Sequence, residues 1–257
     1  MSASSRYIAE CRRLLDTAAS QELEIARAAD WFAASILAGR VVHVFGSGHS
    51  RIPVEEMWPR YGSFPGFHPI VELSLTYHNQ VVGANGQRQA MFLENVSGLA
   101  ARVLRNFAVS TDDSALVISS SGCNTVPIEF AEEIRARGVR VVAIVGKRHM
   151  EASRSRHPRG VKLGEVADLV LDTGIPPGDA LVELDGLDTP VAPGSTVGGV
   201  VLVNAIKAEV AARLVAAGSP PRVLTASCRI GSERATALFE AAYDEHAHRV
   251  APLYADL

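Results

Sequence analysis

Short runs of branched apolar residues alternate along the chain with longer helical patterns. Four of the runs end in glycine, RVVHVFGSG (40–48), SALVISSSG (114–122), VRVVAIVG (139–146) and VADLVLDTG (166–174), and HPIVEL (68–73) is a shorter candidate. Continuous runs of this kind are typical of strands buried on both faces. Strands that alternate with helices need right-handed crossovers and form a parallel sheet. We therefore expect an α/β fold, a three-layer α/β/α sandwich with a five-stranded parallel sheet.

The helical patterns lie between and around these runs. They cover residues 7–37, 55–62, 89–107, 125–138, 195–218 and 232–246. The pattern at 195–218 is apolar on more than one face, and Ser195 or Thr196 is expected to cap it. Residues 180–194 have hairpin-like turn chemistry around Asp185-Gly186. We expect a single domain over residues 1–257, with an N-terminal helical segment at about 1–40 and C-terminal helices.

Composition and charge exclude several classes of protein. The formal net charge is −3 and no basic stripe is present, so nucleic acid is not an expected partner. No apolar run approaches the roughly 20 residues of a membrane span. The N-terminus has no apolar segment typical of a secretory signal. Three cysteines, far apart in the sequence, fit a reduced cytoplasmic setting.

The eight histidines do not form a metal-binding motif. No HExxH sequence is present, and His246 and His248, two residues apart, would point in different directions on a helix. We therefore expect neither a metal nor another cofactor. The most basic stretch, GKRHMEASRSRHPRG (146–160), is interpreted as a solvated loop or short helix.

Two loops rich in glycine and hydroxyl groups follow predicted strands and precede predicted helices. The first is GSGHS (46–50) and the second is SSSGCNT (119–125). Serine hydroxyls, backbone N–H groups and a helix N-terminus together favour binding of a phosphate-type anion. A dinucleotide fingerprint is not complete, because Arg51 stands where a third glycine is required. No Walker-type sequence is present either.

These two loops resemble those of the sugar isomerase (SIS) family, and the resemblance extends from about Val41 to about Leu214. It implies the SIS fold and a phosphorylated sugar as ligand. In this resemblance Ser119, Ser121 and Thr125 contact the phosphate, and Ser47 and Asn124 hold sugar hydroxyls. The candidate substrate-binding residues are Ser47, Gly48, His49, Ser119, Ser120, Ser121, Asn124 and Thr125.

Two glutamates give the resemblance a second component. EEMWPRYG (55–62) is similar to a segment of N-acetylmuramic acid 6-phosphate etherases in which a catalytic glutamate precedes a PxYG ending. Glu56 falls on that glutamate, and Glu94 falls on the second catalytic glutamate of the same enzymes. The spacing between the first loop and Glu56 is shorter than in the etherases. The whole chain resembles more closely a group of phosphoheptose isomerase-like SIS proteins.

The etherase resemblance implies an elimination reaction on an amino-sugar 6-phosphate, such as N-acetylglucosamine 6-phosphate. Glu94 would remove the C2 proton, which the adjacent carbonyl acidifies, and Glu56 would protonate the departing C3 oxygen. Such a pair needs one ionised and one protonated carboxyl. Glu55 and Glu72 are reserve candidates for these roles.

Two alternatives remain open. An aldose–ketose isomerase would use the same deprotonation with one base and return the proton to C1. A non-catalytic sensor would bind the sugar phosphate without turnover. The resemblance also implies a homo-oligomer, a dimer or a tetramer, in which His246 or His248 could reach a neighbouring site.

Overall fold

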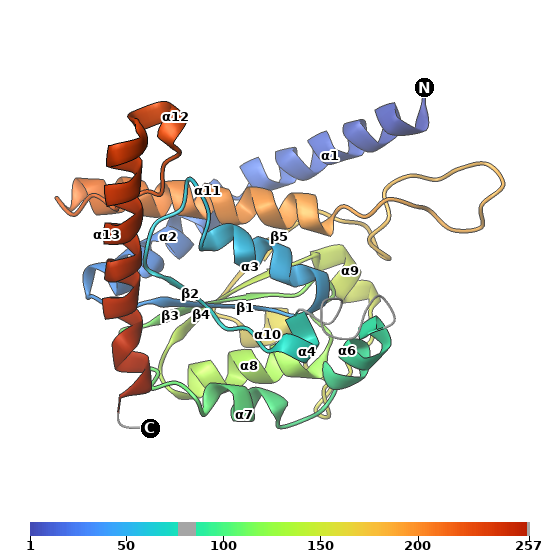
Figure 1. Ribbon diagram of the computed structural model, residues 1–257. Coiled ribbons are helices and arrows are strands. Elements are labelled where there is room, and N and C mark those ends of the chain that lie inside the picture. The colour runs from blue at the N-terminus through green and yellow to red at the C-terminus, as the bar shows by residue number, and fades with distance from the viewer. Residues whose placement is uncertain (77–85, 256–257) are drawn as a thin grey trace.

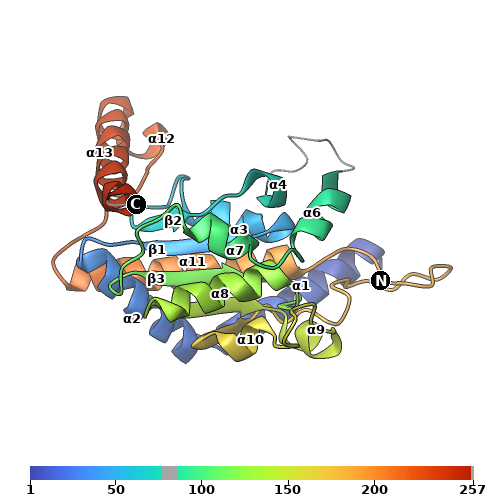
Figure 2. The same ribbon diagram turned by 90° about the horizontal axis from the view of Figure 1, so that it is seen from below.

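The computed structural model describes residues 1–76 and 86–255, and five strands within them form one parallel sheet of order β2-β1-β3-β4-β5 (Figures 1 and 2). The strands are β1 (Val42–Gly46), β2 (Phe67–Pro69), β3 (Ser114–Ile118), β4 (Arg140–Val145) and β5 (Leu169–Asp172). The predicted fold class is therefore confirmed. The chain reverses its direction across the sheet between β1 and β3, the place where α/β folds of this kind bind ligands.

Helices cover both faces of the sheet, which makes the three layers (Figure 1). One face carries α1 (Ala3–Ala19), α2 (Glu22–Leu37), α3 (Arg51–Met57) and α11 (Ser195–Ala216). The other carries α4 (Leu73–Thr76), α6 (Gln87–Leu93), α7 (Leu99–Leu104), α8 (Thr125–Ala136) and α10 (Leu163–Val166). The remaining helices are α9 (Lys147–Ala152), α12 (Ser227–Ile230) and α13 (Ser232–Val250), with short 3₁₀ turns η1 (Gly48–Ser50) and η3 (Ala251–Tyr254).

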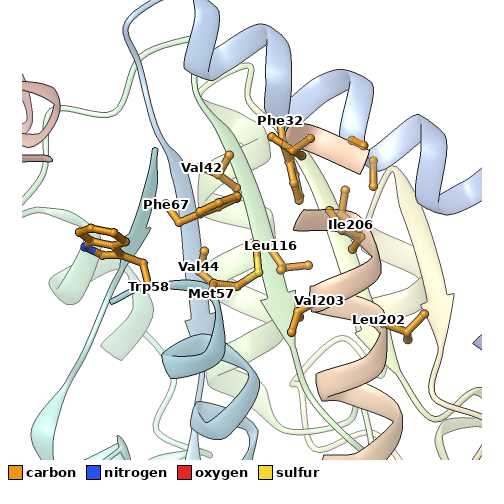
Figure 3. Packing of buried hydrophobic residues seen from close by; sticks show 14 of the residues in the cluster. Phe32, Val42, Val44, Met57, Trp58, Phe67, Leu116, Leu202, Val203 and Ile206 are labelled. Carbon is orange, nitrogen blue, oxygen red and sulfur yellow. The ribbon is translucent and has the colours of Figure 1, made fainter. Parts of the chain in front are cut away.

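The larger apolar core lies between the sheet and the α2–α11 layer (Figure 3). Phe32 of α2 and Ile206 of α11 are fully buried there, and so are Val42 and Val44 of β1 and Leu116 of β3. Each such side chain contributes about 1.5–3 kcal/mol by its removal from water. The core fixes the strands, and therefore fixes where the loops at their carboxyl ends emerge.

Helix α11 uses its several apolar faces within the chain, because it packs against α1, α2 and α3. The expectation that Ser195 or Thr196 caps this helix is wrong. Its N-cap residue is Gly194, and the carboxylate of Asp179 accepts hydrogen bonds from the N–H groups of Gly194 (3.0 Å) and Ser195 (2.8 Å). Asp179 belongs to the hairpin-like arm at 176–193, which projects from the body and has an antiparallel bridge between Val182 and Val191 (Figure 1).

The single amphipathic helix expected at 89–107 is divided into α6 and α7. Gly98 adopts a left-handed conformation (φ +85°) between them. The Glu129 carboxylate accepts hydrogen bonds from the Ser97 hydroxyl and from the Gly98 N–H (2.7 Å), which satisfies groups at the start of α7. The break makes Glu94 the C-cap residue of α6 rather than a mid-helix residue.

Other differences from expectation are smaller. The helical pattern at 7–37 forms two helices, α1 and α2, and β2 has only three residues. Within the described ranges, no helix is both long enough and apolar enough to cross a membrane.

A buried polar cluster lies at the amino end of the sheet, opposite the two glycine–serine loops. His43 of β1 contacts the Asp113 carboxylate through Nε2 (3.1 Å) and His68 of β2 through Nδ1 (3.2 Å). Arg40 donates two hydrogen bonds of 2.9 Å to the same carboxylate. Burial, together with the charges of His43 and His246, lowers the pKa of His68 to about 3. Hydrogen bonds from His43 and Arg40 outweigh the effect of burial and lower the pKa of Asp113 to about 2.

This cluster predicts that the protein loses stability in acid. The unfolded chain protonates His68 near its ordinary pKa of 6.5, whereas the folded chain does so only near pH 3. The free energy of unfolding should therefore fall as the pH drops from about 6.5 to 3, by an amount on the order of a few kcal/mol. Urea unfolding at several pH values should show a smaller slope for His68→Gln. The control His248→Gln, at an exposed position, should keep the wild-type slope, and equal slopes in both variants would contradict the assignment.

We predict that the chain associates with other copies of itself through the exposed face of helix α13. Ala242 is its one buried residue, and Phe239 (41% exposed) and Tyr243 (36%) lie near Tyr61 (61%) on the surface. An apolar face of this kind is typical of a contact surface. Light scattering should give a mass of at least two chains of 27.3 kDa. Phe239→Glu with Tyr243→Glu should reduce it to one chain, whereas Leu23→Glu, at another exposed apolar position, should not.

Candidate functional site at the carboxyl edge of the sheet

The loop after β1 turns sharply, and steric constraints require glycine at two of its positions. A Cβ at Gly46 would lie 2.5 Å from the Ser50 carbonyl oxygen, so no side chain fits there. Gly48 has φ +54°, and a Cβ there would lie 3.3 Å from Oε1 of Glu94. Gly46 therefore permits the tight turn, and Gly48 lets the backbone of the loop approach the Glu94 carboxylate closely.

The loop after β3 is shaped by its own hydroxyl groups. The Gly122 N–H donates to both the carbonyl and the hydroxyl oxygen of Ser119, each at 3.2 Å. The Cys123 N–H donates to the Ser121 hydroxyl oxygen (3.3 Å). A serine that accepts such a bond still has its own O–H to donate to a ligand. Thr125 is buried, and its hydroxyl donates to the Arg156 carbonyl (3.0 Å).

Glu94 joins the two loops. Its side chain is buried, and its carboxylate accepts hydrogen bonds from the Asn124 amide and the Ser47 hydroxyl. Its backbone carbonyl accepts the N–H of Val126 in the first turn of α8 (2.9 Å). One residue therefore connects the end of α6, the β1 loop and the start of α8, at the point where the sheet order reverses.

The surroundings of Glu94 suit a group that exchanges protons. Burial raises the pKa of the Glu94 carboxyl, and the hydrogen bonds from Ser47 and Asn124 and the charge of Arg156 oppose that rise without cancelling it. A carboxyl whose pKa is moved toward neutral pH is a more effective general base or acid than an ordinary glutamate.

A partly enclosed cavity of about 250 Å³ lies beside the β1 loop, at the ends of β3, β4 and β5. Its polar lining comprises His49, Ser50, Ser120, Thr173, Asp179, Ser195 and Thr196. The hydroxyl oxygens of Ser120 and Thr173 are buried and have no hydrogen-bond partner among the residues that the structure describes. Buried hydroxyls of this kind would be satisfied by a polar ligand such as a sugar. We call this space the enclosed cavity.

A second cavity, of about 680 Å³, adjoins the same β3 loop. It is lined by Ser121, Cys123, Asn124, His149, Ser153, Arg154, Ser155, Arg156 and His157. We call it the basic cavity. Ser120 lines the enclosed cavity and Ser121 lines the basic one, so consecutive residues of the loop contact the two spaces.

The predicted site residues are mostly close together. The Ser47 and Asn124 side chains are hydrogen-bonded to Glu94, and Gly48 lies beside its carboxylate. His49 and Ser120 line the enclosed cavity, and Ser121 and Asn124 line the basic cavity. Ser119 and Thr125 are buried within the β3 loop and its helix, so they shape the loop.

Glu56 is separate from this group. Its carboxylate accepts hydrogen bonds from Asn204 of α11 (2.8 Å) and from Arg60, and Lys207 donates to its backbone carbonyl (2.7 Å). It lines a surface groove with Tyr61 and the aromatic side chains of α13, and neither of the two cavities.

The electrostatics of Glu56 also differ from those of a general acid. Burial disfavours its ionised form, but the hydrogen bonds from Asn204 and Arg60 and the charge of Lys207 outweigh burial and lower its pKa. A general acid needs the opposite shift. Burial and the charge of Arg60 lower the pKa of Lys207 to about 8, and the charge of Glu56 opposes this shift.

The reserve carboxylates and the late histidines have structural surroundings of their own. Glu55 is exposed and lies 3.6 Å from Arg51, and the Glu72 carboxylate accepts the N–H of Leu75 in α4 (2.9 Å). His246 packs against Trp58, and His248 is exposed. In residues 1–76 and 86–255, no group of three or more His, Cys, Asp or Glu side chains is arranged to hold a metal.

Sequence reasoning missed Thr173, Asp179, Ser195, Thr196 and Arg156. Thr173 and Gly174 follow β5 in the same way that the two recognised loops follow β1 and β3. A search of every predicted strand end for hydroxyl groups would have found Thr173. The sequence holds no such signal for Asp179 and Arg156, because their positions depend on the way in which long loops fold back.

Comparisons with known proteins show the family. Residues 6–146 match the family described as SIS domain. The UPF0309 protein lin2794 of Listeria innocua is 32% identical over 238 residues, 92% of this chain and 94% of the relative. A UPF0309 protein of Brucella anthropi is 34% identical over 203 residues, 79% of this chain and 80% of the relative.

Two solved structures are similar at low sequence identity. The phosphoheptose isomerase GmhA from Neisseria gonorrhoeae is 15% identical, with a TM-score of 0.48 over 80% of this chain and 96% of the other. The sugar isomerase domain of an RpiR transcription factor from Sphaerobacter thermophilus is 16% identical, with a TM-score of 0.49 over 94% and 96%.

The surroundings of Glu56 predict a structural role for this residue. Glu56→Gln should lower the free energy of unfolding by about 1–3 kcal/mol, because Arg60 and Asn204 lose a charged acceptor. Thermal unfolding measures this loss, and turnover of a substrate should stay within a few-fold of wild type. Loss of turnover with unchanged stability would instead indicate a catalytic role for Glu56.

Proposed function

The chain belongs to the SIS-domain family, and on this basis we propose that it binds a phosphorylated sugar at the carboxyl edge of its sheet and moves a proton beside the sugar carbonyl. One observation carries the proposal. Glu94 is a buried carboxyl with a raised pKa, held by Ser47 of one loop and Asn124 of the other. Both loops carry the hydroxyl groups and N–H groups that suit a phosphate.

The chemistry begins with the open-chain sugar. The ionised Glu94 carboxylate removes the C2 proton of an aldose phosphate, and the electron pair of the broken C–H bond forms the C1–C2 double bond of an enediolate. Return of that proton to C1, with transfer of a proton from O2 to O1, gives the ketose. Phosphate binding positions the substrate, which makes proton transfer to one carboxylate effective.

Isomerisation is the function that the geometry supports best, because it needs one base. The enclosed cavity contributes hydroxyl groups and His49 near the reacting end, and Glu94 is the one carboxyl in contact with both loops among the described residues. Glu56 lies in another groove and has a lowered pKa.

Elimination from an amino-sugar 6-phosphate is the second candidate. The match of both Glu56 and Glu94 to the catalytic glutamates of the etherases favours it. With an acetamido group at C2 the ordinary isomerisation is blocked, and loss of the C3 oxygen becomes the available outcome. This reaction needs a proton donor for the C3 oxygen.

A substrate panel separates these functions. The protein is incubated with pentose, hexose and heptose phosphates and with hexosamine 6-phosphates, with and without N-acetylation, in heavy water. Isomerisation gives a product whose mass differs from that of the substrate only by the deuterium taken up at carbon, and elimination gives loss of water. Binding without deuterium uptake or mass change in any member would indicate a sensor, and absence of binding throughout would contradict the proposal.

Substitution of Glu94 tests the base. Glu94→Gln should lower kcat by about 10²–10⁴-fold and abolish C2 exchange, while substrate still binds. In the wild type, kcat/KM should fall with decreasing pH along a limb above the ordinary glutamate pKa of 4.5, because the base must be ionised and its pKa is raised. Glu55→Gln, at an exposed neighbour of Glu56, is the control. Retained exchange in Glu94→Gln would overturn the assignment.

A further inference from the structure

The most basic stretch of the sequence forms the short helix α9 and a loop whose exposed side chains Arg154 and Arg156 border an open cavity. After α9, residues 153–157 run along the β3 loop and supply Ser153, Arg154, Ser155, Arg156 and His157 to the basic cavity. The other lining residues are neutral hydroxyl, amide and thiol groups and His149, and no carboxylate is among them. The cavity therefore combines two guanidinium groups with Ser121 and Asn124 of the predicted phosphate loop.

Backbone hydrogen bonds hold this segment against the β3 loop. The Arg156 N–H donates to the Cys123 carbonyl (2.8 Å), and the Arg156 carbonyl accepts the Thr125 hydroxyl (3.0 Å). Both the backbone N–H and the backbone carbonyl of Arg156 are thus hydrogen-bonded to the segment that follows β3. The attachment keeps the backbone of Arg156 beside the β3 loop.

No carboxylate of the described residues pairs closely with Arg154 or Arg156, although the charge of Arg156 acts on the Glu94 carboxyl from a longer distance. Neither side chain forms an ion pair with any residue in the two described ranges, whereas the nearby Arg159 pairs with Glu132. Arginine is the side chain best suited to bind a phosphate through two parallel hydrogen bonds. Two such side chains beside serine hydroxyls make a site for a dianion.

The enclosed cavity has the opposite electrostatic character. Asp179 lines it, and the carboxylate of Asp179 already accepts the N–H groups of Gly194 and Ser195 at the N-terminus of α11. These N–H groups would otherwise attract an anion. The enclosed cavity therefore suits the neutral hydroxyls of a sugar better than its phosphate.

We propose that residues 153–157 form the cationic half of the phosphate site, with the phosphate bound in the basic cavity between Ser121 and Asn124 on one side and Arg154 and Arg156 on the other. The proposal rests on the proposed function, since it assigns the phosphate end of the same substrate. It adds two binding residues that lie outside both recognised loops. Arg156 carries the larger share, because its backbone is attached to the β3 loop at both flanks.

Phosphate binding tests the proposal without turnover. Inorganic phosphate and a sugar phosphate that binds the wild type are titrated by calorimetry into wild type, Arg156→Gln, Arg154→Gln and Arg159→Gln. Arg156→Gln should weaken both ligands by about 10- to 100-fold, the range expected for lost hydrogen bonds to a charged group. Arg154→Gln should have a smaller effect, and Arg156→Lys should recover part of the affinity. Arg159→Gln should bind as the wild type does.

The outcomes separate this proposal from the broader one. Equal binding of the sugar phosphate by wild type and Arg156→Gln, with equal melting temperatures, overturns the arginine assignment and leaves the proposed function standing. Loss of phosphate affinity in Thr173→Ala and Thr196→Ala, but not in Arg156→Gln, would place the phosphate in the enclosed cavity and also overturns it. A wild type that binds neither phosphate nor any sugar phosphate overturns both proposals.

Discussion

The pairing of β1 with β3 is the interaction on which the candidate site depends. Hydrogen bonding between these strands places Val42 beside Ser114 and Gly46 beside Ile118, so the strands end at the same level. Two loops far apart in the sequence therefore begin next to each other. Fully buried apolar side chains on both faces of the two strands hold this register, because a shift by one residue would turn those side chains to the wrong face.

The sequence alone was sufficient for the sheet and for the two loops. Runs of valine and isoleucine ended by glycine predict buried strands through steric preferences that act locally. The same reasoning failed for Glu94, which was expected within one helix at 89–107. Its place at the end of α6 depends on the left-handed Gly98 and on Glu129 of α8, a contact between distant segments.

Glu56 illustrates the limit of a match by motif. Its residue type and its position before the PRYG ending agree with a catalytic acid. Of the partners that lower its pKa, Arg60 is local, but Asn204 and Lys207 come from α11 far along the chain. No local pattern reveals such partners. The carboxylates of Glu56 and Glu94 therefore have opposite pKa shifts although both matched the same enzymes.

The carboxylate of Asp179 has a consequence for ligand selection. It accepts hydrogen bonds at the N-terminus of α11 beside the enclosed cavity. Arg154 and Arg156 line the basic cavity, which adjoins the same β3 loop. A ligand that spans both cavities therefore meets positive charge at one end, from Arg154 and Arg156, and negative charge at the other, from Asp179. With the phosphate in the basic cavity as proposed, we expect a sugar with one phosphate to align with these charges in one orientation. If the phosphate binds as proposed, a sugar with phosphates at both ends would bring its second charge against Asp179, and we expect charge repulsion rather than size to favour monophosphates over bisphosphates.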